Sequence, residues 1–167
     1  KSDYVCFIDA DDYWYPNLLQ EMFQNINHFS GQKVFSAAKE IETKKNIFSA
    51  QYSIKKKADC QIVNYFDSSH KESAIWTSCA VFHKSVFNEV GAFDPEIKIG
   101  EDTDLWIRIG LKYPVVFNWN VLARYVFDKQ SASRSSRYIF EERSFLKYAQ
   151  EEKENKSLKK FLDLNRF

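Results

Sequence analysis

The chain has little cysteine, almost no net charge and no long apolar run. Its three cysteines are widely spaced and form no CxxC pair, which fits free thiols in a reducing compartment better than a disulfide framework or a zinc site. The 24 basic and 23 acidic residues leave a net charge of +1, so a broad nucleic-acid-binding surface has no support. No apolar run approaches the roughly 20 residues that a membrane-spanning helix needs.

Apolar and aromatic residues are abundant by contrast. They make up 44% and 17% of the 167 residues, enough for one compact core. Alternating and continuous apolar runs predict strands at residues 4–8, 33–41, 46–52, 76–82, 115–117 and 121–127. Helical spacing predicts helices at residues 16–29, 85–90 and 102–111 and in the segment 137–162, whereas residues 62–66 are ambiguous. The pattern is that of an α/β fold.

An acidic run, DADD, follows the first predicted strand at residues 9–12. Asp9 and Asp11 are two apart on an extended chain, so they project to the same side and can share one Mg²⁺ or Mn²⁺ ion. A calcium-binding loop would need other residues at Tyr13 and Trp14. A phosphatase with an aspartyl nucleophile also starts from a strand and Asp-x-Asp, but Tyr13 departs from its usual continuation. A plain turn leading into the helix at Pro16 is the structural alternative.

A second acidic run, GEDTD, opens the predicted helix at residues 100–104. Acids are favoured in a first helical turn, because they face unpaired N–H groups and the positive end of the helix dipole. Asp104 and Arg108 are four apart and can pair along the helix. A turn-rich stretch at residues 90–96 leads into the run, so Asp102 can also face a cleft as a general base. The sequence leaves the cap and the base open as interpretations of Asp102.

Three segments, taken in order, resemble the inverting glycosyltransferases of family two, which have the GT-A fold. The first is residues 3–14 (DYVCFIDADDYW), the second is residues 76–94 with its WTSCAVFHKSVF and VGAFD stretches, and the third is residues 100–108 (GEDTDLWIR). The resemblance implies a Rossmann-related mixed sheet flanked by helices. It implies a catalytic and acceptor-binding part at residues 1–136, and we assign residues 137–167 to a C-terminal helical extension.

The resemblance also implies a role for each matching acid. Asp9 and Asp11 match the Asp-x-Asp pair that holds Mg²⁺ or Mn²⁺ against the diphosphate of a nucleotide sugar, which we expect to be a UDP-sugar. Asp12 matches a supporting acid near the ribose or the donor sugar. Asp102 matches the base that deprotonates the acceptor hydroxyl, and Glu101 beside it contacts the acceptor or orients the site.

Trp76, Thr77 and Ser78 fall where members of the family line the sugar pocket, and we assign them to acceptor binding. The implied reaction transfers a sugar to a hydroxyl with inversion, in the biosynthesis of a polysaccharide or glycan. The implied setting is the cytoplasm, with a glycan or lipid-linked acceptor. Mixed-charge helices near the C-terminus would then contact the inner face of the membrane peripherally.

The first half of the family fold, which grips the nucleotide base, has no counterpart in this sequence. We therefore expect a later part of a longer enzyme, which folds alone, transfers little sugar alone and self-associates through its open sheet edge. Many members have a His near residues 124–128, where this chain has none, so Lys129, Arg134 or Arg137 would cover the phosphates instead. A non-catalytic glycosyltransferase-like module and an Asp-x-Asp phosphohydrolase remain alternatives.

Overall fold

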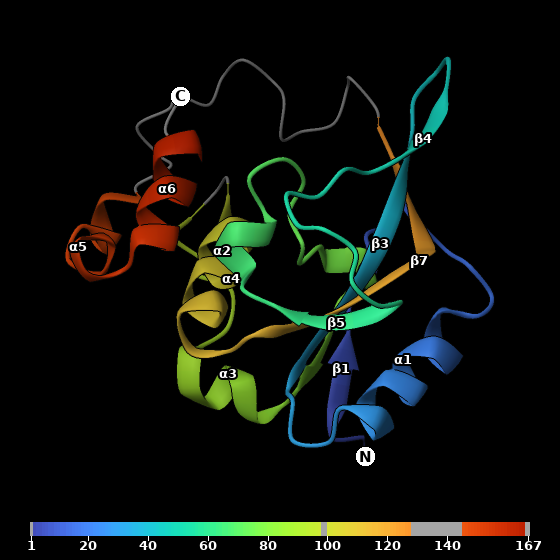
Figure 1. The fold of residues 1–167 in the computed structure, drawn as a ribbon, viewed down its shortest axis with the longest axis horizontal. Helices are drawn as coiled ribbons and strands as arrows, with labels where there is room; N and C mark the ends of the chain where they lie inside the picture. The colour runs from blue at the N-terminus through green and yellow to red at the C-terminus, as the bar shows by residue number, and fades with distance from the viewer. Residues whose placement is uncertain (1, 98–99, 128–144, 166–167) are drawn as a thin grey trace.

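The computed structural model describes residues 2–97, 100–127 and 145–165 (Figure 1). Its strands are β1 (Tyr4–Cys6), β2 (Tyr13–Trp14), β3 (Val34–Glu42), β4 (Ile47–Ser49), β5 (Cys60–Val63), β6 (Val81–His83) and β7 (Val115–Val126). Its α-helices are α1 (Leu18–His28), α2 (Tyr65–Ser68), α3 (Ser85–Val90), α4 (Glu101–Lys112), α5 (Glu151–Glu154) and α6 (Lys156–Asn165), and its short 3-10 helices are η1 (Thr77–Cys79) and η4 (Phe145–Tyr148).

The strands form one mixed sheet with the order β1-β6-β3-β7-β2; β4 pairs with β3, and β5 pairs with β7. Only β3 and β7 are parallel to each other among the strand pairs of the described residues. Helix α1 lies on one side of the sheet, while α2, α4 and α6 lie on the other (Figure 1). This arrangement confirms the predicted α/β class with a mixed sheet and flanking helices.

Both faces of the central strands are buried because both carry helices. In β3, Val34 packs into the core beneath α4, whereas Phe35 packs into the core beneath α1. The same alternation places Val115 and Val116 of β7 in opposite cores. Strands that are covered on both faces read as continuous apolar runs, which is why β3 was predicted as one strand and β7 as two.

The two strands predicted at residues 115–117 and 121–127 are one strand, β7, which is a correction to the sequence prediction. The parallel register of β7 with β3 is irregular at this point. Ala37 pairs with Asn118, but the next residue of β3, Ala38, pairs with Val121. Trp119 and Asn120, which lie between these two paired residues, therefore form an irregularity inside the strand. The side chains of Asn118 and Asn120 both donate to the carboxylate of Glu21 on α1, at 3.1 and 3.4 Å.

Other boundaries also differ from the prediction. The ambiguous residues 62–66 divide into the end of β5 and the start of α2, where the Asn64 side chain accepts a hydrogen bond from the N–H of Asp67. The strand predicted at residues 76–82 begins instead as the 3-10 turn η1 and becomes β6 at Val81. The strand β2 has only two residues, too few for a periodic pattern that would predict it.

Asp104 joins α4 to the segment that follows the undescribed residues 128–144. Its buried carboxylate accepts hydrogen bonds from Arg108 Nε at 2.9 Å and from the Tyr148 hydroxyl at 2.6 Å, and it pairs with Lys147 Nζ at 2.5 Å. Arg108 in turn donates to the carbonyl groups of Val90 and Ala92. The predicted pair of Asp104 and Arg108 is confirmed, and it is one part of a larger network.

We expect Asp104→Asn to lower the free energy of unfolding by about 3 to 5 kcal/mol, because it removes one member of a buried charge network. Burial acts to raise the pKa of Asp104, but hydrogen bonds from Lys147, Tyr148 and Arg108 outweigh it and lower that pKa. The carboxylate therefore contributes stability above the ordinary pKa of about 3.9, and this contribution is lost as the pH falls through the lower folded pKa.

Urea unfolding at neutral and at acidic pH measures the effect of Asp104→Asn. The matched control is Asp163→Asn, which breaks the exposed pair with Lys159 on α6, also four residues apart. Exposed pairs contribute about 0 to 1 kcal/mol, so this variant should unfold almost like the parent. Equal losses in the two variants would contradict the structural role given to Asp104.

Candidate active site

Antiparallel pairing of β1 with β6 brings the acidic residues 9–12 close to η1. Cys6, at the end of β1, pairs with Val81, at the start of β6. The acidic turn after β1 therefore lies beside η1, which precedes β6. The contact is direct, because the N–H of Asp9 donates to the hydroxyl of Ser78 at 3.0 Å.

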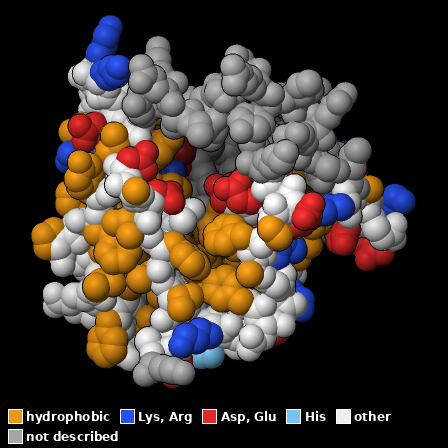
Figure 2. Space-filling view, turned by 180° about the vertical axis from the view of Figure 1, so that it is seen from behind, with side chains coloured by type: hydrophobic (Ala, Val, Ile, Leu, Met, Phe, Trp, Pro, Cys, Tyr) orange, Lys and Arg blue, Asp and Glu red, His pale blue; other side chains and the backbone are white. Residues whose placement is uncertain are grey.

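A cavity of about 410 Å³ receives both acidic runs. Asp9 and Asp11 line it from the turn after β1, Trp76 and Thr77 line it from the start of η1, and Asp102 lines it from the first turn of α4. Its volume lies in the range of about 300 to 1,000 Å³ that small-molecule sites occupy. Figure 2 shows acidic side chains gathered along the upper border of the broad apolar area on the face seen from behind.

The acids that line the cavity repel one another. Burial raises the pKa of Asp9, and the charges of Asp11 and Asp102 raise it further, against a lowering hydrogen bond from Ser78. A cation placed among these carboxylates would relieve the repulsion. The described residues hold no ready group of three or more His, Cys, Asp or Glu side chains that could bind a metal. Mg²⁺ characteristically takes one or two carboxylates and completes its shell with water and substrate phosphates, so Asp9 and Asp11 fit such an ion.

Asp12 and Ser78 support the acidic turn from beneath. Asp12 is 7% exposed; one of its oxygens accepts from the Ser78 hydroxyl at 2.6 Å, and the other accepts from the N–H of Val126 at 3.2 Å. Ser78 is fully buried. Neither Asp12 nor Ser78 is among the described residues that line the cavity. The polar atoms of Asp12 and Ser78 hold the turn against η1 and β7, and the ligand contacts predicted for the two residues stay predictions.

Asp102 serves the helix with one oxygen and faces the cavity. The N-cap is Gly100, whose φ of 80° suits a residue without Cβ, and it offers no side-chain cap. Asp102 Oδ1 accepts from the N–H of Thr103 at 2.6 Å, while the described part of the chain gives Oδ2 no donor. The cap and the base are therefore compatible roles. Glu101, one residue earlier, is half-buried but is not among the described residues that line the cavity.

An aromatic wall stands beside the acids. Trp76 and Tyr125 meet edge to face, with ring centroids 5.6 Å apart. Both rings line the cavity, and such faces stack well against the apolar side of a sugar ring. Trp14, the other tryptophan near an acidic run, donates its indole N–H to the carbonyl of Ser78 at 2.6 Å. Trp14 is thus used within the turn, whereas Trp76 lines the cavity.

Comparison with protein families agrees with this geometry. A family model described as glycosyltransferase like family 2 matches residues 1–161. The chain belongs to this glycosyltransferase family. The fold is GT-A-like, and membership implies in general that a nucleotide-sugar donor and an acceptor are bound. No curated protein matches the chain.

The glycosyltransferase cavity also contains residues that the sequence analysis missed. Lys39 of β3 and Tyr125 of β7 belong to its wall, as do Lys71 and Ser73 from the loop after α2 and Phe161 from α6. Only one of them carried a signal in the sequence, namely Lys39, a charged residue within an apolar strand. The others come from segments far apart in the chain, and no local pattern links them.

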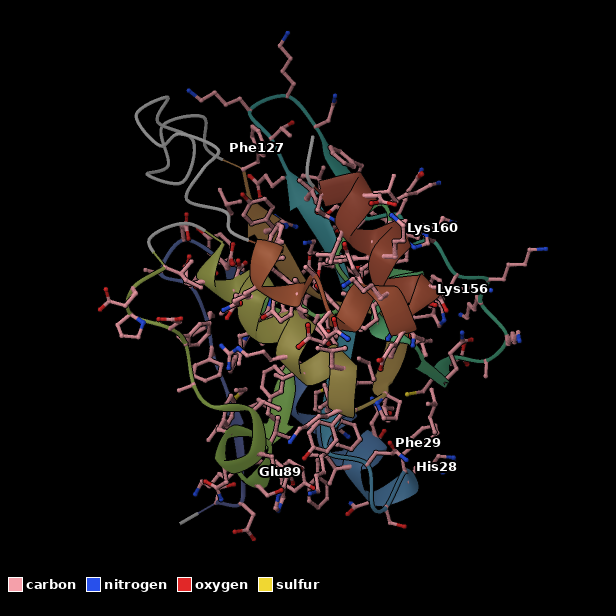
Figure 3. All side chains as sticks on the ribbon, turned by 90° about the vertical axis from the view of Figure 1, so that its left-hand side faces the viewer. His28, Phe29, Glu89, Phe127, Lys156 and Lys160 are labelled. Atoms are coloured by element: carbon pink, nitrogen blue, oxygen red, sulfur yellow. The ribbon has the colours of Figure 1, made fainter. Side chains whose placement is uncertain are left out.

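Three predictions about the glycosyltransferase stay predictions. The residues proposed to cover the phosphates, Lys129, Arg134 and Arg137, lie outside the described residues. Figure 3 shows Lys156 and Lys160 on the outer side of α6, but membrane contact through this helix is untested. No helix in the described ranges has the length and apolar character needed to cross a bilayer. Self-association through the outer edge of β1, an end strand of the described sheet, is equally untested.

Proposed function

We propose that this domain transfers a sugar from a nucleotide donor, a UDP-sugar, to an acceptor hydroxyl with inversion and with the help of Mg²⁺ or Mn²⁺. The observation that carries the proposal is that Asp9, Asp11 and Asp102 line one cavity together with the half-buried Trp76. Such a set combines a place for a diphosphate, a base and a sugar-binding surface. The acceptor would belong to a growing polysaccharide or other glycan.

Asp9 and Asp11 would hold the cation, which supplies charge stabilisation to the leaving diphosphate when bound. Asp102 would accept the proton of the acceptor hydroxyl through Oδ2, the oxygen that is not used by Thr103. Trp76 would orient the acceptor ring. Because one carboxylate takes the proton and no covalent sugar intermediate is required, displacement from the face opposite the diphosphate inverts the anomeric carbon.

Asp12 and Ser78 would act by positioning. Their mutual hydrogen bond and the contact of Ser78 with the N–H of Asp9 fix the turn that presents Asp9 and Asp11. Glu101 would act on the acceptor side only through the first turn of α4. The ligand contacts that the sequence analysis expected of these residues stay predictions.

The test is a donor and acceptor screen of the enzyme that contains this domain, with Mn²⁺, with Mg²⁺ and with a chelator. We expect release of UDP that depends on both the acceptor and the cation, and a product of inverted configuration by NMR. Release of phosphate from simple phosphate esters would instead favour the phosphohydrolase. Binding of saccharides without any turnover of nucleotide sugars would favour the non-catalytic module.

A further inference from the structure

A lysine is buried in the wall of the cavity. Lys39 of β3 is 5% exposed, yet it lines the same cavity as Asp9 and Asp102. Lysine is almost never this buried unless its charge is paired, because removing an ammonium group from water is costly. The partners of Lys39 therefore indicate what its charge is for.

The charge of Lys39 is only partly compensated. Its Nζ lies 3.3 Å from Glu72, which is itself 39% exposed and is the one ion-pair partner that the described part of the chain offers. The same Nζ lies 4.7 Å from the centre of the Trp76 ring and 5.6 Å from that of Tyr125. Ring faces attract a cation but accept no strong hydrogen bond. An ammonium group has three N–H donors, so Lys39 retains capacity for a further anionic partner.

Lys71 adds a second lysine to the cavity wall. Lys71, which also lines the cavity, donates to the side chain of Gln51 at 3.3 Å, and Gln51 accepts from the N–H of Glu72 at 3.1 Å. Glu72 is the partner of Lys39, so the two lysines are neighbours. Asp9, Asp11 and Asp102 line the same cavity, and in the part of the chain that the structure describes none of them forms an ion pair with either lysine.

Trp76 lies next to Lys39 and is close in the chain to the residue that binds Asp9. Its ring faces Lys39, and its chain neighbours in η1 lead directly to Ser78, which holds Asp9. A sugar ring stacked on this tryptophan would therefore have one edge toward the acids and another toward the lysines. The first edge would carry the reacting hydroxyl, close to Asp102.

We propose that the acceptor sugar carries an anionic group, a carboxylate or a phosphate, and that Lys39 binds this group with Lys71 beside it. The inference rests on the proposed function, because it names the acceptor class for the same site. The diphosphate of the donor is the competing anion, but its place is with the cation at Asp9 and Asp11. Lys39 then selects the acceptor, and Trp76 orients it.

Binding of small probes tests the proposal without requiring turnover. Methyl glucuronide, glucose 6-phosphate and methyl glucoside are titrated into the full chain and followed by NMR at fixed ionic strength. We expect the carboxylate or the phosphate probe to bind about ten-fold more tightly than the neutral one, and Lys39→Met to abolish that preference, because a hydrogen bond to a charged group is roughly twice as strong as one between neutral groups. The two charged probes distinguish a uronic acid from a sugar phosphate.

Two further variants make the test specific. Glu72→Gln removes the competing counter-ion of Lys39 and should strengthen binding of the charged probe. Lys33→Met breaks an ion pair with Glu89 on the outside of the molecule and should leave the preference unchanged. Glu89 lies on α3, well away from α6 in Figure 3.

Two results would overturn the inference. One is equal binding of charged and neutral probes by the parent chain, and the other is a loss of UDP binding, rather than of probe preference, in Lys39→Met. These results are separable from those of the proposed function. Sugar transfer to neutral acceptors alone would refute the anionic acceptor and leave transfer standing, whereas anion-selective binding without consumption of any nucleotide sugar would do the reverse.

Discussion

Asp102→Asn, in the enzyme that contains this domain, should reduce turnover by a factor on the order of 10² to 10⁴ while the protein remains folded. Removing a positioned general base has this typical cost, because the acceptor hydroxyl is a weak nucleophile until its proton is taken. The asparagine keeps an oxygen that can accept from the N–H of Thr103, so the first turn of α4 keeps its hydrogen bond. The loss should appear in kcat with little change in the affinity for the donor.

The matched control for Asp102→Asn is Glu101→Gln. Glu101 precedes Asp102 in the same helical turn but is not among the described residues that line the cavity, so its neutralisation should change turnover far less. We expect the free energy of unfolding of both variants, measured by thermal unfolding, to differ from that of the parent by at most about 1 kcal/mol, the size of a helix-dipole effect. A clear loss of stability with normal turnover in Asp102→Asn would leave Asp102 as a cap only, and the base would then be sought at Glu101 or Asp94.

Asp11→Ala should lower turnover about 10³-fold or more and weaken the binding of Mn²⁺ together with UDP. The cation supplies several kcal/mol of charge stabilisation at the diphosphate, and Asp11 would be one of its two protein ligands. The fold should not suffer, since Asp11 is exposed and its charge raises the pKa of Asp9. Removing Asp11 therefore relieves repulsion in the protein without ligand.

Isothermal titration of UDP with and without Mn²⁺ measures the binding half of this prediction. Asp59→Ala serves as the control, because Asp59 is exposed and pairs with Lys56 outside the cavity. Its affinity for UDP with Mn²⁺ should equal that of the parent. Full turnover of Asp11→Ala in the presence of a chelator would remove the metal assignment, and the diphosphate would have to be held by protein cations alone.

The two acidic runs show how far local sequence can lead. Crowded carboxylates after an apolar strand are costly unless they serve a purpose, so Asp9 and Asp11 stood out before any fold was known. The same reasoning did not foresee the surroundings of Asp12. It follows the same strand, but it is turned inward, where Ser78 and Val126 occupy its two oxygens. The direction of a side chain in a tight turn depends on partners 66 and 114 residues away, which no local pattern contains.

Sequence alone determined the class of the fold, the helices α1, α3 and α4, and the family, because these depend on apolar periodicity and on short runs of neighbouring residues. Only the tertiary structure decided what surrounds the acids. Antiparallel pairing of β1 with β6 brought Trp76 beside them, and the shared wall of β3 and β7 added Lys39 and Tyr125. Such contacts join residues that are distant along the chain. They depend on how the strands and helices pack together, not on the spacing of residues in the sequence.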